Sequence, residues 1–235
     1  MKEQNSKKQL LKTAFLDSVP ILAGYVVLGA GFGIILKSKG YGVLWAIAMS
    51  VFIYAGSMQY VAIDLLAGGA SLISAATTTL LVNARHAFYG ISMIEQYRDA
   101  GKKRPYLIFA LTDETYSLVC GKKLPEGINK HNYYFLVSLF DQIYWIVGSV
   151  LGSALGSVLK ISFEGIDFAL TALFVTVFVE QWLSTKDHIY AITGVVSSVL
   201  CLVIFGSGSF LIPSMVLITL SLTLLRRFRK EGADA

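Results

Sequence analysis

Apolar residues occur along this chain in a series of long blocks, which are separated by short polar or glycine-containing stretches. Each block holds roughly 16 to 28 residues, about the length that an α-helix needs to cross a hydrocarbon core of about 30 Å. The blocks occupy residues 19–36, 43–66, 71–89, 106–121, 133–159, 168–182, 189–205 and 210–225. Ten-residue stretches of alternating apolar and polar residues, the mark of membrane β-barrel strands, are absent from the sequence. The pattern predicts an all-α, polytopic helix bundle with about six to eight transmembrane segments.

The fourth segment is short and carries Asp113 and Glu114 near its centre. The second segment is interrupted at its middle by the small and polar residues of Ala55–Gln59. Membrane transporters often break a helix at such a point, so that free backbone groups face a solute. On this interpretation Ser57 and Gln59 line a cavity, and ordinary helix packing is the alternative.

The composition agrees with a membrane protein. Of the 235 residues, 55% are apolar and 15% are charged, whereas about a quarter of the residues of a soluble domain are charged. We expect a single transmembrane domain over residues 15–225, between a basic tail at residues 1–14 and a C-terminal tail at residues 226–235. The segment after the basic tail has no small-residue cleavage site, which favours a cytoplasmic tail over a removed signal peptide.

The distribution of Lys and Arg tests how the segments cross the membrane. The basic residues lie in the tails and in short loops, of which 98–104 and 122–130 are the most basic. Both termini are expected in the cytoplasm, because cytoplasmic loops carry an excess of Lys and Arg. If the third and fourth segments are broken or re-entrant, both basic loops become cytoplasmic as well. The rule therefore favours that arrangement over eight plain spans.

Several other classes of function find no support in the sequence. The net charge of +5 is spread over the short loops, which is not the pattern of a nucleic-acid-binding surface. No phosphate-binding loop, cofactor fingerprint or metal-ligand spacing is present, so neither a cofactor nor a metal is expected. Serines such as Ser57 or Ser209 could be paired with His86 in a membrane hydrolase. A Gly-Ser pair alone is weak support for an enzyme, because catalytic triads are recognised by geometry.

Arg85 and His86 lie at the end of an apolar run and are the strongest functional candidates. Charged groups at membrane depth are costly unless they have partners or face water. The guanidinium of Arg85 could bind the carboxylate of an amino-acid-like solute, or it could form a structural salt bridge with a carboxylate of a neighbouring segment. Histidine is the side chain whose ordinary pKa lies closest to neutral pH, so His86 suits proton coupling, although an interfacial or hydrogen-bonded role is the alternative.

The possible partners lie on other segments. Asp113 and Glu114 are about 100° apart around a helix, so they are expected to serve different partners, a solute ammonium group and a coupled proton among them. Asp141 and Gln142 form a polar cluster in the fifth segment that could instead belong to the interface. The complete set of candidates for substrate binding or coupling is Ser57, Gln59, Asn83, Arg85, His86, Asp113, Glu114, Tyr116, Asp141 and Gln142.

Glycines at four-residue spacing predict close helix packing. Gly29 and Gly33 form one pair in the first segment, and Gly148, Gly152 and Gly156 share one face of the fifth. The face of the fifth segment could pack inside the bundle or against another subunit.

The order of these motifs along the chain resembles the AzlC family of branched-chain amino acid permeases. The resemblance covers roughly residues 15–156, and the last three segments match only in hydropathy. The motifs are Pro20, Gly24, Gly29 and Phe32-Gly33, then Ala55–Gln59, then Asn83-Ala84-Arg85-His86 with Tyr89-Gly90, then Thr112-Asp113-Glu114 with Tyr116, and Asp141-Gln142 with Tyr144-Trp145.

The resemblance implies export of leucine, isoleucine, valine and similar apolar amino acids across the bacterial inner membrane. It also implies a small second membrane subunit of the AzlD type, and an energy source in the proton gradient or the membrane potential. The preferred amino acid is left open, because one methylene in an apolar pocket changes affinity by only about 1–3 kcal/mol. Uptake in place of export and a non-transporting scaffold subunit are the alternatives.

Overall fold

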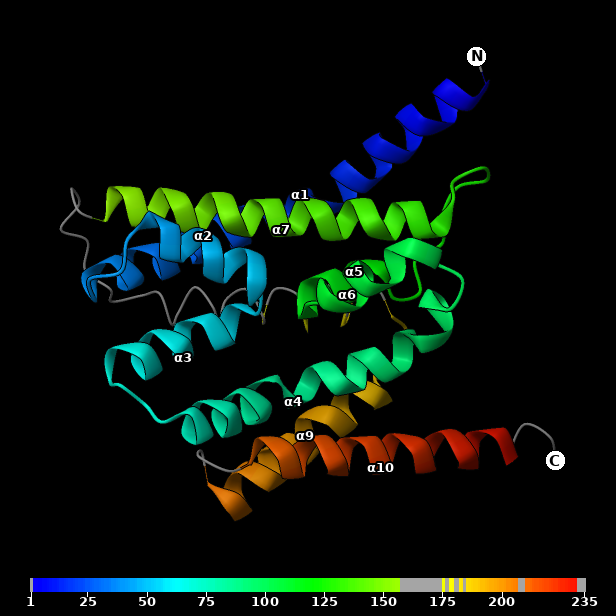
Figure 1. Ribbon diagram of the computed structural model, residues 1–235. Helices are drawn as coiled ribbons and strands as arrows, with labels where there is room; N and C mark the ends of the chain where they lie inside the picture. The colour runs from blue at the N-terminus through cyan, green and yellow to red at the C-terminus, as the bar shows by residue number, and fades with distance from the viewer. Residues whose placement is uncertain are drawn as a thin grey trace. The chain divides into compact units, whose positions relative to one another are not determined.

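The computed structural model describes residues 2–156, 185–206 and 210–231, together with a few single positions between 175 and 183. These residues form helices joined by short connections, and no β-strand occurs among them (Figure 1). The chain divides into two compact units, which we call the N-terminal unit (Met1–Phe174) and the C-terminal unit (Val175–Ala235).

Two long helices, α1 (Lys2–Ser38) and α7 (Lys130–Leu155), lie side by side in the N-terminal unit (Figure 1). The most apolar 18-residue stretch within Lys7–Ser38 has a mean hydropathy of 2.2 and that within α7 has one of 1.5, so both helices are long and apolar enough to cross a membrane. Pro20 lies inside α1, because this helix begins well before the first apolar segment predicted from the sequence.

Glycines bring these two helices into backbone contact at Gly29, Gly33, Gly148, Gly152 and Gly156. A Cβ atom added to Gly33 would lie 2.1 Å from the carbonyl oxygen of Ser149, and one added to Gly152 would lie 2.0 Å from that of Ala30. Any side chain at these positions would collide with the backbone of the other helix. Contacts advance along both helices in the same direction, so α1 and α7 run parallel.

The second predicted segment is a hairpin of two short helices, α2 (Val43–Phe52) and α3 (Gly56–Ala67). The interruption expected from the sequence is present at residues 53–55. The segment does not cross the unit, because Asp64 near the end of α3 lies 3.8 Å from Lys39, just before α2. Helices of 10 and 12 residues are about 15 to 18 Å long, roughly half of a hydrocarbon core. We call this element the first hairpin and residues 53–55 its tip.

The fourth predicted segment is also a hairpin, and it enters from the opposite end (Figure 1). A 3₁₀ turn (Gly101–Lys103) leads into α5 (Arg104–Phe109), and α6 (Asp113–Val119) returns after a break at residues 110–112. This is the broken arrangement that the charge distribution favoured for the fourth segment. We call it the second hairpin and residues 110–112 its tip.

Contacts show that the two basic loops lie at one end of the N-terminal unit. Lys103 donates a hydrogen bond to Asn132 at the start of α7. Lys122 forms a salt bridge of 2.9 Å with Asp17 of α1. We call this the basic end, and the end with Lys39 the far end.

The third predicted segment is one uninterrupted helix, α4 (Leu72–Tyr97), so the predicted break in this segment is wrong. The side chain of Ser71 caps its start by accepting a hydrogen bond from the backbone N–H of Ser74 at 3.2 Å. No proline follows inside the helix, and 26 residues span about 39 Å. The helix is therefore long enough to run from the far end to the basic end.

The C-terminal unit contains α9 (Ile189–Phe205) and α10 (Leu211–Glu231), which pack against each other. The first agrees with the predicted segment 189–205, and the second extends beyond the predicted segment 210–225. Most of the predicted segment 168–182 lies outside the described residues.

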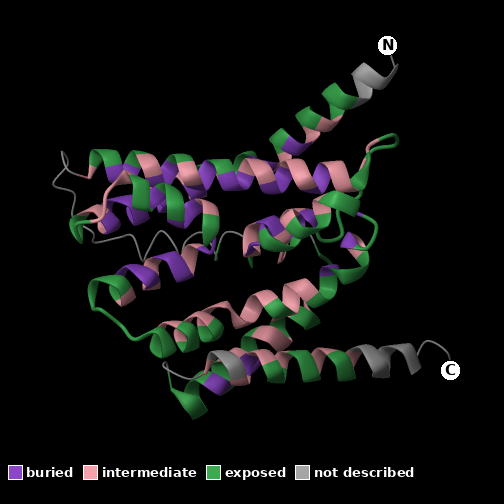
Figure 2. Cartoon of the chain, in the orientation of Figure 1, coloured by how far each residue is buried: buried purple, intermediate pink, exposed green. Residues whose placement is uncertain are grey.

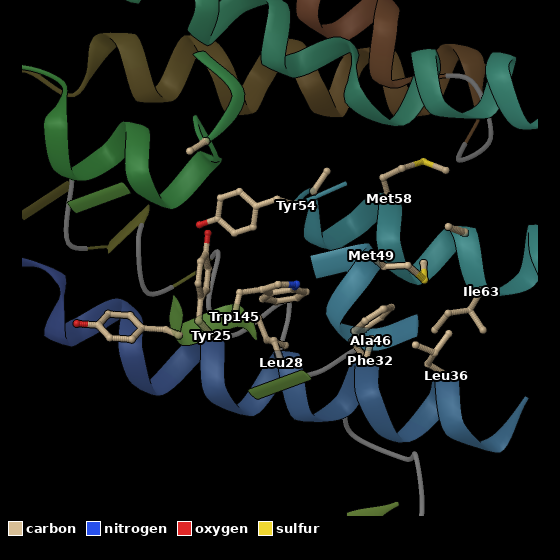
Figure 3. Packing of buried hydrophobic residues seen from close by; sticks show 14 of the residues in the cluster. Tyr25, Leu28, Phe32, Leu36, Ala46, Met49, Tyr54, Met58, Ile63 and Trp145 are labelled. Atoms are coloured by element: carbon tan, nitrogen blue, oxygen red, sulfur yellow. The ribbon is translucent and has the colours of Figure 1, made fainter. Parts of the chain in front are cut away.

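The core of the N-terminal unit packs around Trp145, Phe32 and Ile63, which come from α7, α1 and α3 (Figure 3). Figure 2 shows buried positions along α7 and in α3, and few in α4. Large apolar side chains such as Leu44 and Leu72 are more than four-fifths exposed. Such side chains on outward faces are expected where lipid is the surrounding solvent.

Candidate functional site

The tips of both hairpins border a small cavity in the middle of the N-terminal unit. Its volume of about 30 Å³ holds one or two water molecules. We call it the central cavity. It is lined by Tyr25 and Leu28 of α1, Tyr54, Ala55, Gly56 and Ser57 of the first hairpin, Arg85 and His86 of α4, Thr112, Asp113 and Glu114 of the second hairpin, and Trp145 of α7.

Arg85 connects the two hairpins across this cavity. Its Nη2 donates a hydrogen bond of 2.8 Å to Oγ of Ser57, in the first turn of α3. Its Nη1 lies 3.1 Å from Oδ2 of Asp113, in the first turn of α6. His86 Nε2 lies 3.8 Å from the other oxygen of Asp113. A guanidinium, an imidazole and a carboxylate therefore meet at one wall, and none of the three side chains is more than 28% exposed.

Five side chains form a chain of hydrogen bonds between two carboxyl groups. The hydroxyl of Tyr25 donates to Glu114 Oε2 at 2.7 Å and lies 2.8 Å from Oγ1 of Thr112. Thr112 Oγ1 lies 3.1 Å from Oγ1 of Thr115, which donates to Asp141 Oδ2 at 2.7 Å. This series of hydrogen bonds runs from Glu114 of the second hairpin to Tyr25 of α1 and back to the second hairpin at Thr112 and Thr115. It ends at Asp141 of α7.

Asp141 is fully buried at the end of this chain. Its second oxygen, Oδ1, is also buried and accepts no hydrogen bond from the part of the chain that the structure describes. An ionised carboxylate in such surroundings is costly, so carboxyl groups of this kind are typical of proton-binding positions in membrane proteins.

The N-terminus of α3 borders the central cavity. Its N-cap residue is Ala55, whose side chain has no atom that could accept a hydrogen bond. Gly56 and Ser57, the first residues of the helix, line the cavity. Helix N-termini attract anions through these N–H groups and through the helix dipole.

Two predicted glutamine positions lie outside the central cavity. Gln59 is fully buried and accepts a hydrogen bond of 2.8 Å from the indole of Trp145. Gln142 accepts one of 2.8 Å from Tyr106 of the second hairpin. Both amides connect helices to one another, so the structure gives them packing partners where the sequence suggested a solute.

Tyr116 and Asn83 also lie away from this cavity. The ring of Tyr116 stacks on Tyr89 of α4 with centroids 5.1 Å apart. Asn83 lines a second, larger cavity that adjoins the first. Of the ten predicted site residues, the central cavity therefore brings together Ser57, Arg85, His86, Asp113 and Glu114.

A comparison with protein families places this arrangement in context. The family model described as "AzlC protein" matches residues 20–159. The "Branched-chain amino acid transport protein AzlC" of Bacillus subtilis is 42% identical over 226 residues, which cover 95% of this chain and 89% of the relative. The chain belongs to the AzlC family.

Other members of the AzlC family are named as membrane proteins. An "Uncharacterized membrane protein" of Helicobacter pylori is 41% identical over 92% of this chain and 95% of its own length. The "Inner membrane protein YgaZ" of Escherichia coli is 30% identical over 68% of each chain. No solved structure matches the chain. Membership in a family of transport proteins agrees with the prediction that the chain is not an enzyme.

The region matched by the AzlC family model contains every residue of the central cavity, including two tyrosines that the sequence did not single out. Figure 3 shows the hydroxyl groups of Tyr25 and Tyr54 pointing toward each other, with Trp145 beside Tyr25. Tyr54 has φ = 41°, and it is the one non-glycine residue with positive φ in the described residues. Such strain gathers at functional sites. Its only signal in the sequence is its place directly before Ala55-Gly56-Ser57.

Proposed function

We propose that this chain is a secondary transporter that exports branched-chain and similar apolar amino acids across the bacterial inner membrane, together with a small membrane subunit of the AzlD type. The name of the Bacillus subtilis relative supports the substrate class. The contact between Arg85 and Asp113 at the wall of the central cavity carries the proposal, because it offers a cation and an anion within one site.

The geometry suits a zwitterion. The carboxylate of an amino acid would bind between the guanidinium of Arg85 and the N-terminus of α3, where Gly56 and Ser57 present backbone N–H groups. The ammonium group would bind Asp113 or Glu114. Binding would then replace one contact between charges of the protein with two contacts to the solute, so that neither protein charge is left unpaired in the membrane.

The central cavity is too small for an amino acid, which needs several times its volume. Substrate binding would therefore require one hairpin to move away from the other. The hairpins enter from opposite ends, so movement of each would open the cavity toward a different side. This is the behaviour expected of transporters that contain broken helices and bind their substrate near the middle of the membrane.

The chain of hydrogen bonds between Glu114 and Asp141 is our candidate for coupling to the proton gradient. Carboxyl groups inside membrane segments mark proton relays. Glu114 lines the central cavity, while Asp141 does not and is connected to it through hydroxyl groups. A proton bound at this pair would therefore respond to substrate at Asp113. His86 is a second candidate for proton coupling, because it lies beside the carboxylate of Asp113.

The orientation follows from the basic end. The basic N-terminal tail and both basic loops gather there, so this end faces the cytoplasm under the positive-inside rule. A central cavity loaded from this end would release its solute at the far end, which corresponds to export.

The decisive experiment measures leucine efflux from preloaded proteoliposomes that contain the chain and its small partner. The variant Arg85→Ala should lose at least about tenfold in efflux, a barrier of about 1.4 kcal/mol, at equal protein content. Arg98→Ala is the matched control, because Arg98 is 62% exposed and pairs with Glu95 away from the cavity. It should transport as the wild type does.

The alternatives give different results. A scaffold subunit would show no efflux above empty membranes for any apolar amino acid, with or without Arg85. An uptake transporter would move leucine only when the gradient is imposed from the far end. A hydrolase would lose turnover of a peptide or lipid on replacement of Ser57 by alanine.

A further inference from the structure

A second cavity of about 530 Å³ adjoins the central cavity on the side of the basic end. The two cavities share Tyr54, Ala55 and His86, so these three residues lie between them. From there the larger cavity extends between the second half of α4 and α5, and reaches Arg104 at the start of the second hairpin. Its volume lies within the range of about 300 to 1,000 Å³ that is typical of small-molecule sites.

Two residues of its wall carry polar atoms without a hydrogen-bond partner among the described residues. The hydroxyl of Tyr97 and Oδ1 of Asn83 are both buried, and neither has a hydrogen-bond partner among the described residues. Tyr97 is 2% exposed. Buried polar groups are nearly always hydrogen-bonded, so a change of rotamer toward the cavity would let both atoms reach water or a ligand inside it. Both residues line this same cavity.

Apart from Tyr54, His86 and Arg104, the rest of the wall is apolar, and it leaves space beside Gly90. A Cβ atom added to Gly90 would meet no atom within 4 Å, although the residue lies inside α4. Ile94 and Ile108 form part of the wall and are 51% and 58% exposed, so the cavity is open on one side. A space with apolar walls, unpaired polar atoms and a cation at its outer limit fits an apolar amino acid together with water.

We infer that this larger cavity is a water-filled vestibule, which admits the amino acid from the basic end and holds it before it passes Tyr54 and His86 into the central cavity. The inference rests on the proposed function and adds a second binding position to it. In the vestibule, Arg104 would attract the carboxylate, Asn83 and Tyr97 would bind the polar groups or their water, and the apolar wall would hold the side chain.

The test uses cysteine labelling in a variant without native thiols, Cys120→Ser with Cys201→Ser. Into this background we would introduce Gly90→Cys, and Ala76→Cys as the control. Ala76 is an exposed residue in the other half of α4 and lines neither cavity. A charged, membrane-impermeant methanethiosulfonate added at the basic end should modify Gly90→Cys, and leucine should slow this reaction by at least about tenfold. The same reagent should not modify Ala76→Cys, because this residue lies near the far end of α4.

A steric variant gives a second measurement. Gly90→Phe should fill the vestibule without a backbone collision and lower leucine efflux by at least about tenfold, whereas Ala76→Phe should leave it unchanged. If Gly90→Cys reacts only with an apolar maleimide, the cavity holds a lipid chain and the inference is wrong. It is also wrong if Gly90→Phe loses the small partner subunit, because the cavity would then be a subunit interface.

The two levels of the proposal fail separately. Leucine efflux by the wild type, together with unprotected Gly90→Cys and an active Gly90→Phe, would overturn the vestibule alone. A wild type that moves no apolar amino acid would overturn the proposed function and the assignment of the vestibule's ligand with it.

Discussion

The two hairpin tips have corresponding places at the central cavity and opposite chemistry. Each starts a helix at the central cavity, so the N-terminal ends of α3 and α6 both face it. The first turn of α3 contains no acidic residue, and Ala55 gives it no side-chain cap. The first turn of α6 contains Asp113 and Glu114, and the side chain of Thr112 caps it by accepting from the N–H of Thr115.

This difference divides the cavity into two halves. A helix N-terminus carries roughly half a positive charge, which acidic residues in the first turn offset. At the second tip, the two acidic residues carry more negative charge than the partial positive charge at the start of α6. At the first tip, no acidic residue offsets the partial positive charge of α3, and Arg85 adds a further positive charge beside Ser57. A fold with two opposed hairpins thus becomes a site for a zwitterion when only one tip is acidic.

The largest effect is expected from making the tips alike. In Ser57→Asp the new carboxylate would sit at the N-terminus of α3 beside Arg85, in the place proposed for the carboxylate of the substrate. Leucine efflux should fall to the level of empty membranes. The free energy of unfolding should rise by about 0.3 to 1 kcal/mol, because an acid at a helix N-terminus stabilises the helix. Efflux assays and thermal unfolding of the same preparation check both results.

Ser57→Ala is the control for this variant. It removes the hydrogen bond to Arg85 without adding a charge, so part of the efflux should remain. Equal loss of transport in Ser57→Ala and Ser57→Asp would contradict a carboxylate site at the first tip.

A smaller effect is expected from neutralising the second tip. Asp113→Asn keeps the shape of the side chain but removes the anion proposed for the ammonium group, and efflux should fall about tenfold to a hundredfold. Asp64→Asn removes a carboxylate of a different ion pair, which is 79% exposed, and should transport normally. Leucine efflux at matched protein content is the measurement. Unchanged efflux in Asp113→Asn would leave the second tip without a role in substrate binding.

The sequence predicted where a helix is interrupted better than it predicted the direction that the chain takes afterwards. Gly56 and Ser57 correctly marked the interruption of the second segment, because local backbone preferences are visible in a short stretch. That the segment turns back is visible in the nearness of Asp64 to Lys39, a contact that hydropathy does not reveal. For the same reason, the distribution of Lys and Arg predicts re-entrant elements in the third and fourth segments, whereas the structure has them in the second and fourth.

The candidate site could likewise be predicted only where local sequence carries the signal. Charges in apolar surroundings were conspicuous, so Arg85 and Asp113 could be named from the sequence. Tyr25 could not, because its bonds to Thr112 and Glu114 join residues 87 and 89 positions apart. Gln59 was conspicuous for its polarity, yet its partner is Trp145, 86 positions away. Polarity shows which residues need a partner, and only the fold shows whether that partner is a solute or another side chain.

The smallest effect concerns the difference in capping between the two tips. Thr112→Ala should lower the free energy of unfolding by about 1 kcal/mol, because it removes the N-cap of α6. Thr112→Ser keeps a hydroxyl that can accept from the N–H of Thr115 and should retain most of the stability. In the opposite direction, Ala55→Ser would give α3 the cap that it lacks and should stabilise the protein by no more than about the same amount. Denaturation in detergent compares the three variants with the wild type. If Thr112→Ser proves as unstable as Thr112→Ala, the hydroxyl of Thr112 is not what stabilises the start of α6, and the contrast between the tips rests on charge alone.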